Sequence, residues 1–400
     1  MMTGSPQTRD GGTRAAFGAL DGVSPARAAI GFYVHVPFCE RRCHYCSFNT
    51  APRDDEEVAR YLRAVDRELG LLATLPWAGR TAVATIFLGG GTPSLLAPEA
   101  LAALLERIRA GFSMAPDAEV TVECNPESVS RARLERYRAA GVNRVSLGVQ
   151  SLDDALLARL GRLHDARRAG AAFAAAREAG FDNVSIDLMY GLPGQDVAAW
   201  RRTVDGALAW GPDHVSAYAL TLDGGSAWAP GTVPDLPAEE AVVQQYWLLA
   251  RAAAARGLEH YEISNYARPG RRARHNEIYW RAEEYLAAGP GGSGFIGGVR
   301  YGNARPLARY CASLEAGTLP IDSAERLTAR QVLGERLMLG LRTSDGVPVG
   351  WLDERAADEP ALARRLEAWR ERGLLTTACG RGRLTEAGFL LSDSLFVELL

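Results

Sequence analysis

Short apolar segments alternate with longer amphipathic segments along the first two thirds of the chain. The apolar segments are rich in β-branched and aromatic residues and predict buried strands at Gly31–Val36, Ala82–Leu88, Glu119–Cys124, Arg144–Val149, Asn183–Leu188 and His214–Leu220. The amphipathic segments between them predict helices at Glu56–Leu72, Pro98–Ala110, Arg131–Ala140, Ala166–Ala179 and Val197–Trp210. Six consecutive βα units favour an α/β fold with a parallel sheet, either curled into a partial barrel or open and doubly wound.

The pattern changes towards the C-terminus. A helix at Ala238–Arg256 and a strand at His260–Ala267 complete the predicted barrel, 30–267, and a flexible tail is expected at 1–29. Region 268–322 has glycine clusters and little periodicity, which predicts a connecting region. The remaining residues, 323–400, predict a winged-helix-like α+β domain, with helices at Ala324–Leu341 and Pro360–Arg372, a hairpin at Leu374–Leu384 and a last helix from Thr385.

Composition excludes several function classes. All 45 basic side chains are arginine, and the net charge is −3. Without lysine the chain can form neither a P-loop phosphate clamp nor a pyridoxal phosphate Schiff base. Its near-neutral balance argues against nucleic-acid binding, and the 323–400 region, with 11 Arg against 12 acidic residues, gives that module no basic surface either.

The cysteines and the apolar segments predict where the protein works. The first thirty residues lack the apolar core of a signal peptide, and no uncharged run is as long as a membrane span. We therefore expect a cytoplasmic protein with reduced thiols, whose association with membranes would be transient. Three of the six cysteines fall within eight residues. In a reducing compartment such a cluster indicates metal binding rather than disulfides.

The clustered cysteines, Cys39, Cys43 and Cys46, follow the first predicted strand with C-x3-C-x2-C spacing. A structural zinc site would need a fourth ligand, for which His35 or His44 is available. A [4Fe–4S] cluster held by three cysteines would instead leave one iron without a protein ligand. The spacing alone leaves both interpretations open.

Polar residues at the ends of the other strands point to a ligand. In a βα barrel, functional groups collect where the carboxyl ends of the strands meet the loops. A glycine run, Gly89–Gly91, follows the second strand, and Glu123, Gln150 and Asp187 lie at or near the ends of later strands, with Arg162 between the last two. These groups suit a ligand with an ammonium, a carboxylate and a ribose.

With the cysteine spacing and the GGGTP run, the sequence from Gly31 onward resembles the radical S-adenosylmethionine (SAM) superfamily. The resemblance implies a TIM-like radical SAM barrel of (βα)6 type, a [4Fe–4S] cluster on the three cysteines, and SAM chelating the open iron. It further implies a set of SAM contacts, which in this chain are Tyr33, Gly90, Gly91, Thr92, Glu123, Gln150, Arg162 and Asp187.

Within the superfamily, the chain is similar to the branch that contains oxygen-independent coproporphyrinogen III oxidase and the HemW-type haem chaperones. The oxidase motif carries a fourth cysteine where this chain has Phe48. A downstream HNxxYW stretch, beginning at His275, resembles the HemW signature, which implies haem binding by His275 with propionates meeting nearby arginines at 271, 272 and 274. From the residues alone, a structural role for His275 beneath the barrel is the stronger alternative.

The resemblance departs from its pattern at Ser293, where HemW-like sequences carry a further histidine. The expected function is a haem chaperone that delivers haem to haem-requiring, respiratory proteins. One alternative is a radical SAM oxidoreductase that abstracts hydrogen from a porphyrinogen, so the sequence does not decide whether the chain is an enzyme. Another is a zinc-stabilised binding module.

Overall fold

A computed structural model describes residues 18, 20–222, 224–357 and 359–397. Its main sheet has the order β14-β13-β12-β11-β1-β4-β5-β6-β7-β8-β10-β9. The six predicted parallel strands are confirmed as β1 (Ala29–Val36), β4 (Ala82–Gly90), β5 (Ser113–Cys124), β6 (Arg144–Gln150), β7 (Val184–Tyr190) and β8 (His214–Ala219). These strands are neighbours in chain order, whereas a doubly wound sheet reverses its order at a switch point. The sheet is therefore a partial (βα)6 barrel.

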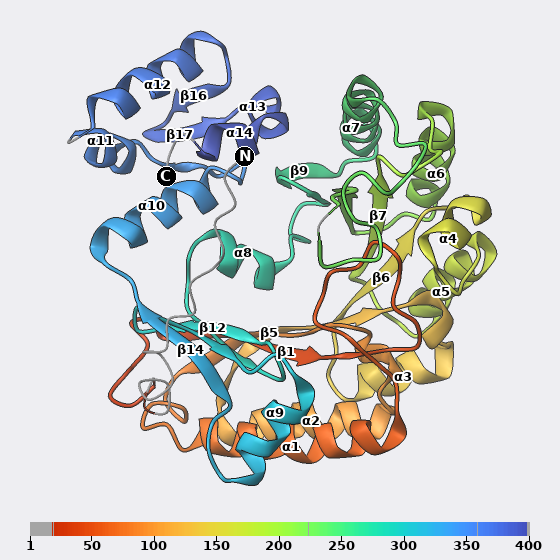
Figure 1. Ribbon diagram of the computed structural model, residues 1–400, viewed down its shortest axis with the longest axis vertical. Helices are drawn as coiled ribbons and strands as arrows, with labels where there is room; N and C mark the ends of the chain where they lie inside the picture. The colour runs from red at the N-terminus through yellow and green to blue at the C-terminus, as the bar shows by residue number, and fades with distance from the viewer. Residues whose placement is uncertain (1–17, 19, 223, 358, 398–400) are drawn as a thin grey trace.

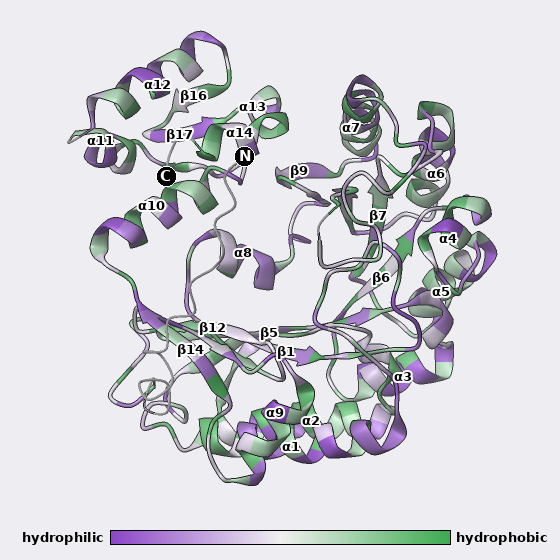
Figure 2. Ribbon diagram, in the orientation of Figure 1, coloured by the Kyte–Doolittle hydropathy of each residue, from purple (hydrophilic) through white to green (hydrophobic). Residues whose placement is uncertain are grey.

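The predicted helices cover the outer face of this curved sheet (Figure 1). They are α1 (Asp55–Ala73), α2 (Pro98–Gly111), α3 (Arg131–Ala139), α5 (Ala166–Glu178), α6 (Val197–Ala209) and α7 (Glu239–Ala254). Figure 2 shows hydrophilic and hydrophobic residues alternating along α1, as expected for a helix with one face on the sheet. Its Asp54 cap accepts from the backbone N–H groups of Glu56 and Glu57. A short helix, α4 (Asp154–Leu160), was not predicted.

The region 268–322 is more than the connection that the sequence predicted, because it extends the sheet. β11 (Tyr285–Ala288) pairs in parallel with β1, and β12 (Ser293–Ile296), β13 (Val299–Asn303) and β14 (Ile321–Arg326) continue in antiparallel fashion, with α9 (Leu307–Glu315) between the last two. The helix predicted at Ala324–Leu341 begins only at Ala329, because residues up to Arg326 belong to β14. At the opposite edge, the strand predicted at His260–Ala267 is a hairpin of β9 (Glu259–Glu262) and β10 (Asn265–Ala267).

The helix α8 (Arg274–Trp280) lies inside the curve of the sheet (Figure 1). The backbone N–H groups of Arg274 and His275 donate to the two carboxylate oxygens of Glu119 on β5, each at 3.1 Å. Arg271, just before the helix, pairs with Asp182, which precedes β7. These contacts place α8 at the end of the barrel where the parallel strands begin, opposite the end that the sequence marks as functional.

The C-terminal residues form a separate small core, with elements α10 (Ala329–Gly340), β15 (Val347–Pro348), α11 (Val349–Ala357), α12 (Pro360–Glu371), β16 (Leu375–Ala378), β17 (Arg381–Leu384), α13 (Glu386–Leu390) and α14 (Ser392–Val397). The predicted hairpin is confirmed and gains β15 as a third strand. This C-terminal module attaches to the β9 edge, where Ile263 N donates to Arg342 O and Ser344 N donates to Tyr261 O. The domain boundaries at 268 and 323 stay predictions.

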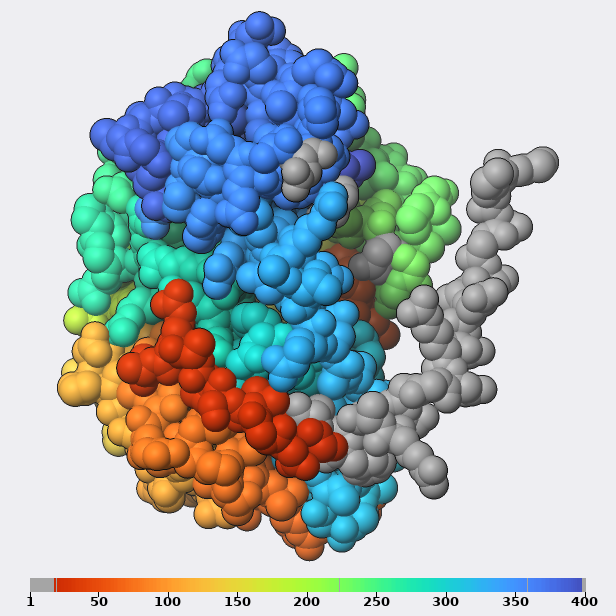
Figure 3. All heavy atoms as spheres, turned by 90° about the vertical axis from the view of Figure 1, so that its left-hand side faces the viewer, coloured from red at the N-terminus to blue at the C-terminus, as the bar shows by residue number. Residues whose placement is uncertain are grey.

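Residues 20–27 of the predicted flexible tail, 1–29, contact the barrel, which corrects that expectation for these residues only. Leu20 and Val23 are buried in the main core, and the indole N–H of Trp77 donates to Val23 O at 2.8 Å. Glu284 accepts from the backbone N–H groups of Ala26 and Arg27. Figure 3 shows this red segment lying along the surface of the molecule. Residues 1–17 and 19 lie outside the described residues.

Among the helices of the described residues, none is both long and apolar enough to cross a bilayer.

Candidate functional site

The cysteine loop is closed at its base by a two-stranded parallel sheet. β2 (Phe38–Cys39) pairs with β3 (Ala51–Pro52), so the residues between them project as one loop. The loop is fastened to the barrel where His44 N donates to Leu160 O. All three cysteines of the motif are free thiols and partly exposed. The local fold therefore presents the three sulfur atoms at the carboxyl end of the barrel.

A cavity of about 1200 Å³, including its open mouth, lies between this loop and the strand ends. It brings together ten of the twelve residues predicted for the site, namely Cys39, Cys43, Cys46, Gly90, Gly91, Thr92, Glu123, Gln150, Arg162 and Asp187. The two that do not line it are Tyr33 and His275. Asn125, Ser146 and Tyr218 also line the cavity and were not assigned from the sequence. Strand periodicity could have indicated Ser146, which lies four residues before Gln150 on the same face.

Hydrogen-bond donors converge on two of the three sulfur atoms. The Thr92 hydroxyl donates to Cys39 Sγ at 3.6 Å, and Arg162 Nη1 donates to Cys43 Sγ at 3.6 Å. Arg162 is held in place because its Nη2 donates to Asn125 Oδ1 at 2.6 Å and to Gly148 O at 2.8 Å. Burial raises the pKa of the Cys39 thiol to about 11, and the donor from Thr92 opposes that rise by favouring the deprotonated, metal-ligating form. The donor set therefore fits thiolates that hold an iron–sulfur cluster.

Two buried carboxylates face the same cavity, and each accepts a hydrogen bond from a different strand. Glu123 Oε2 accepts from Gly90 N at 3.1 Å, and Asp187 Oδ1 accepts from the Ser146 hydroxyl at 3.1 Å. Burial, with the nearby Asp187 charge, raises the pKa of Glu123 to about 8. Burial also raises the pKa of Asp187, while the charge of Arg144 opposes both shifts. Arg144 is 2% exposed and its Nε has no hydrogen-bond partner. The cavity floor thus holds two carboxyl groups that can meet a cationic group of a ligand once they are ionised.

The glycine run allows the backbone to approach closely. Gly90 has φ 110°, in the region that favours glycine. A Cβ on Gly91 would lie 2.6 Å from the carbonyl oxygen of Phe38, at the start of the cysteine loop. Gly91 N donates to Val36 O at 2.8 Å. The run therefore places the strand end of β4 directly against the cysteine loop.

The histidines proposed as a fourth zinc ligand have other partners. His35 contacts the Tyr33 hydroxyl through Nδ1 and Asn49 O through Nε2. His44 Nδ1 contacts Arg159 O at 2.9 Å. Within the described residues, no three His, Cys, Asp or Glu side chains are gathered closely enough to hold a single metal ion. A [4Fe–4S] cluster spreads its cysteine ligands over different irons and does not require such convergence.

His275 lies at the other end of the barrel and is fully buried. Its Nδ1 contacts the Thr85 hydroxyl at 2.7 Å, its Nε2 contacts the Tyr279 hydroxyl at 2.7 Å, and its ring stacks on Phe87. Burial, followed by the charge of Arg144, lowers the pKa of His275 to about 3. With both ring nitrogens occupied, the geometry matches the structural alternative. Haem ligation by His275 stays a prediction that these contacts do not favour.

The three arginines expected to meet haem propionates are paired with carboxylates of the chain itself. Arg271 pairs with Asp182, Arg274 pairs with Asp117, and Arg272 lies 3.0 Å from Asp345. Ser293, at the position of the family's further histidine, is exposed at the start of β12. Neither feature assembles a haem site around His275.

A partial barrel with a three-cysteine loop and a glycine run at its mouth defines a radical SAM protein. Accordingly, residues 33–206 match the family model described as the radical SAM superfamily. The structure is similar to coproporphyrinogen III oxidase (HemN) from Escherichia coli, with a TM-score of 0.83 and 22% identity, covering 98% of this chain and 94% of that one. This likeness supports the fold assigned to the described residues.

Comparison with sequence relatives shows which kind of radical SAM protein the chain resembles. The chain is 41% identical over 389 residues to the haem chaperone HemW of Mycobacterium tuberculosis, covering 95% of this chain and 97% of the relative. It is 35% identical over 378 residues to the HemW of Bacillus subtilis, covering 92% and 98%. The chain belongs to the HemW family. As a radical SAM family, it implies a [4Fe–4S] cluster and SAM.

Proposed function

We propose that the chain is a haem chaperone that binds haem, a [4Fe–4S] cluster and SAM, and delivers haem to haem-requiring proteins. The observation that carries this proposal is the 41% identity to a haem chaperone along almost the full length of both chains. Delivery to respiratory proteins in the cytoplasm is part of the same proposal. The cytoplasmic location is supported by the free, partly exposed thiols of the cysteine loop, which need a reducing compartment.

Cys39, Cys43 and Cys46 would hold the cluster, which when bound supplies an open iron for SAM and an electron for its cleavage. The donors from Thr92 and Arg162 would stabilise the thiolates. The remaining cavity residues would bind SAM, with Arg162 near its carboxylate and the carboxylates facing its cationic groups; these residues are Gly90, Gly91, Thr92, Glu123, Gln150 and Asp187. Tyr33, predicted as a further SAM contact, hydrogen-bonds to His35 and does not line the cavity.

The second candidate is a porphyrinogen oxidoreductase, favoured by the likeness to the Escherichia coli oxidase in fold. Phe48 argues against it. This side chain stands at the cavity, 67% exposed, at the position where the oxidase motif has a cysteine. A phenyl ring can neither ligate a metal nor donate a hydrogen atom as a thiol does. The two candidates therefore differ in what the cavity can do to a second substrate.

Haem transfer and porphyrinogen turnover, measured on one preparation, separate the two functions. The full chain is reconstituted anaerobically with iron and sulfide, loaded with haem, and mixed with an apo-haem protein whose absorbance reports haem uptake. The same preparation is incubated with coproporphyrinogen III, SAM and a reductant. We expect haem transfer and no decarboxylated product. Formation of protoporphyrinogen IX would overturn the chaperone assignment, as would a wild-type chain that takes up no haem.

A further inference from the structure

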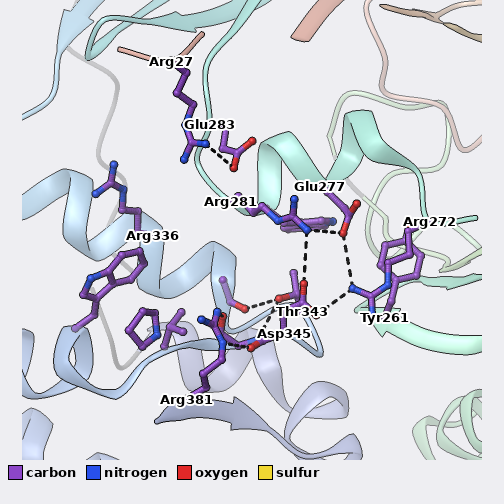
Figure 4. Close-up of a pocket in the computed structure, with 16 residues that line it drawn as sticks. Arg27, Tyr261, Arg272, Glu277, Arg281, Glu283, Arg336, Thr343, Asp345 and Arg381 are labelled. Carbon is purple, nitrogen blue, oxygen red and sulfur yellow. Dashed lines mark hydrogen bonds and ion pairs between the residues drawn. The ribbon is translucent and has the colours of Figure 1, made fainter. Parts of the chain in front are cut away.

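A second cavity lies between α8 and the C-terminal module (Figure 4). It encloses about 770 Å³ including its open mouth. One wall comes from α8 and the residue that follows it, Trp280 and Arg281. The other wall comes from the C-terminal module, with Arg336, Trp351 and Arg381. We call it the seam pocket, because its walls belong to two separately folded parts of the chain.

Ion pairs within the chain occupy one side of the seam pocket. Near α8, Glu277 lies 2.8 Å from Arg281, and Asp345 lies 3.0 Å from Arg272. On the module side, Arg381 donates from Nε and Nη2 to the carbonyl oxygens of Asp345 and Gly346, each at 2.6 Å. Among the described residues, no carboxylate lies within ion-pair distance of Arg381 or Arg336. The pocket thus holds two guanidinium groups that form no ion pair within the described residues, although the charge of Arg381 helps to lower the pKa of Asp345.

Aromatic side chains lie beside these two guanidinium groups. The guanidinium of Arg336 lies over the indole ring of Trp351, with its carbon 5.7 Å from the ring centroid. On the facing wall, the indole N–H of Trp280 is buried without a hydrogen-bond partner. A buried donor left without an acceptor is costly, and a ligand that supplies one removes that cost. The pocket therefore offers flat apolar faces together with cationic and N–H groups for an anion.

We propose that the seam pocket binds a planar aromatic tetrapyrrole through its carboxylates, with haem as the cargo. This inference rests on the proposed function, and it assigns the cargo site to residues of the C-terminal module and Trp280 rather than to His275. Arginine is suited to this role because its planar fork recognises carboxylates and also stacks on flat rings. Arg336 and Arg381 would meet the propionates, and Trp351 would pack against the macrocycle.

The pocket predicts an unusual mode of haem binding. Its lining, drawn from the described residues, includes no histidine, cysteine or methionine. Tyr261 lines it, but its hydroxyl contacts His214 Nε2 at 2.8 Å and accepts from Ala273 N. The macrocycle would then be held by its faces and its carboxylates and not by a strong axial bond to iron. A porphyrin without iron should therefore bind as haem does.

Titrations with protoporphyrin IX, haem and protoporphyrin IX dimethyl ester test this directly, with porphyrin absorbance as the readout. The variants are Arg336→Glu and Trp351→Leu in the full chain. Arg336 is exposed, so its replacement should not disturb folding. Arg330→Glu is the matched control, since Arg330 lies on the same helix, 75% exposed, and does not line the pocket. Circular dichroism of each variant checks the fold.

Wild-type protein should bind protoporphyrin IX and haem with affinities within a few-fold of each other. Arg336→Glu should weaken both by about tenfold or more, because a charge-assisted hydrogen bond becomes a repulsion. The dimethyl ester should bind weakly and equally to wild type and Arg336→Glu, and Arg330→Glu should bind like wild type. Trp351→Leu should weaken all three ligands.

Two results would overturn the assignment of the pocket. One is haem binding that is unchanged in both Arg336→Glu and Trp351→Leu, and the other is a dimethyl ester that binds as tightly as the acid. Either could occur while haem transfer succeeds, which would leave the proposed function intact. Conversely, a chain that binds porphyrins in the predicted manner but transfers no haem would contradict the proposed function and retain the pocket.

Discussion

The two ends of the barrel are built for different chemistry. At the carboxyl ends of the strands, donors point at free thiols and the carboxylates Glu123 and Asp187 line an open cavity. At the opposite end, α8 closes the barrel, and His275 is fully buried with both ring nitrogens in hydrogen bonds. The first end leaves polar groups ready for ligands, whereas the second uses the same kinds of groups to fasten a helix.

The difference shows why residue type alone does not identify a site. A histidine, an arginine and a carboxylate occur at both ends. What distinguishes a binding site from a structural contact is whether the hydrogen-bonding groups of these side chains already have partners within the chain. β6, of seven residues, spans about 20 Å, so a ligand in the seam pocket would lie far from an open iron at the barrel mouth. This separation is consistent with a chaperone that carries its cargo without altering it.

The sharpest test of the two-ended arrangement is Cys43→Ala. It should abolish the iron–sulfur absorbance and the reduced cluster signal in electron paramagnetic resonance, because the open-iron geometry needs all three thiolates. Protoporphyrin IX binding should remain as in wild type. Cys379→Ala, at an exposed cysteine outside the motif, is the control. A cluster that survives in Cys43→Ala would contradict the site.

The barrel mouth should respond to pH through Glu123. Because its pKa in the free protein is about 8, the carboxyl is protonated below that pH and attracts a cation only once it ionises. The affinity for SAM relative to S-adenosylhomocysteine, which lacks the sulfonium charge, should therefore rise by about tenfold between pH 6.5 and 8.5. Isothermal titration measures both ligands. An affinity ratio that does not change with pH in wild type, or that rises equally in Glu123→Gln, would contradict the predicted role of the Glu123 carboxylate in SAM binding.

At the end of the barrel closed by α8, His275→Phe should lower the free energy of unfolding without affecting haem binding. Loss of its two hydrogen bonds leaves the Thr85 and Tyr279 hydroxyls unpaired, at a cost of about 2 kcal/mol in the free energy of unfolding. The native pKa of His275 is about 3, below that of the unfolded chain, so wild-type stability falls as pH decreases below about 6.5 and the variant should lose part of that dependence. Urea unfolding at several pH values measures both effects. Loss of haem binding in a folded His275→Phe would instead support ligation by this histidine.

The smallest effect is expected at the seam itself. Asp345 partly neutralises Arg272 and Arg281, so Asp345→Asn should raise the local positive potential and tighten protoporphyrin IX binding by about threefold. The gain should shrink at high salt, as expected for partly exposed charges. Glu325→Gln, which removes an exposed charge paired with Arg300 on β13, should leave the affinity unchanged. Weaker binding in Asp345→Asn would count against an anionic ligand.

The sequence predicted the barrel and its mouth well, since hydrophobic periodicity locates each strand and strand ends coincide with ligand groups. Ten of the residues expected there line one cavity. Predictions failed where pairing partners are distant in the chain. β11 to β14 are short, and β12 and β13 contain a glycine, so their pairing with β1 and with each other is what makes them strands. The roles of Tyr33 and His275 depend on which neighbours satisfy them, which residue spacing does not reveal.

The attachment of the C-terminal module at β9 has a practical consequence. The sheet does not close on itself, and β9 is its last strand. The backbone contacts from residues 342–344 occupy hydrogen-bonding groups of that strand and the turn after it. A shortened chain that ends before α10 would bare this edge, which is the kind of surface through which proteins aggregate. Attempts to express the barrel alone should therefore yield self-associating material, and the module serves as a solubility element as well as a pocket wall.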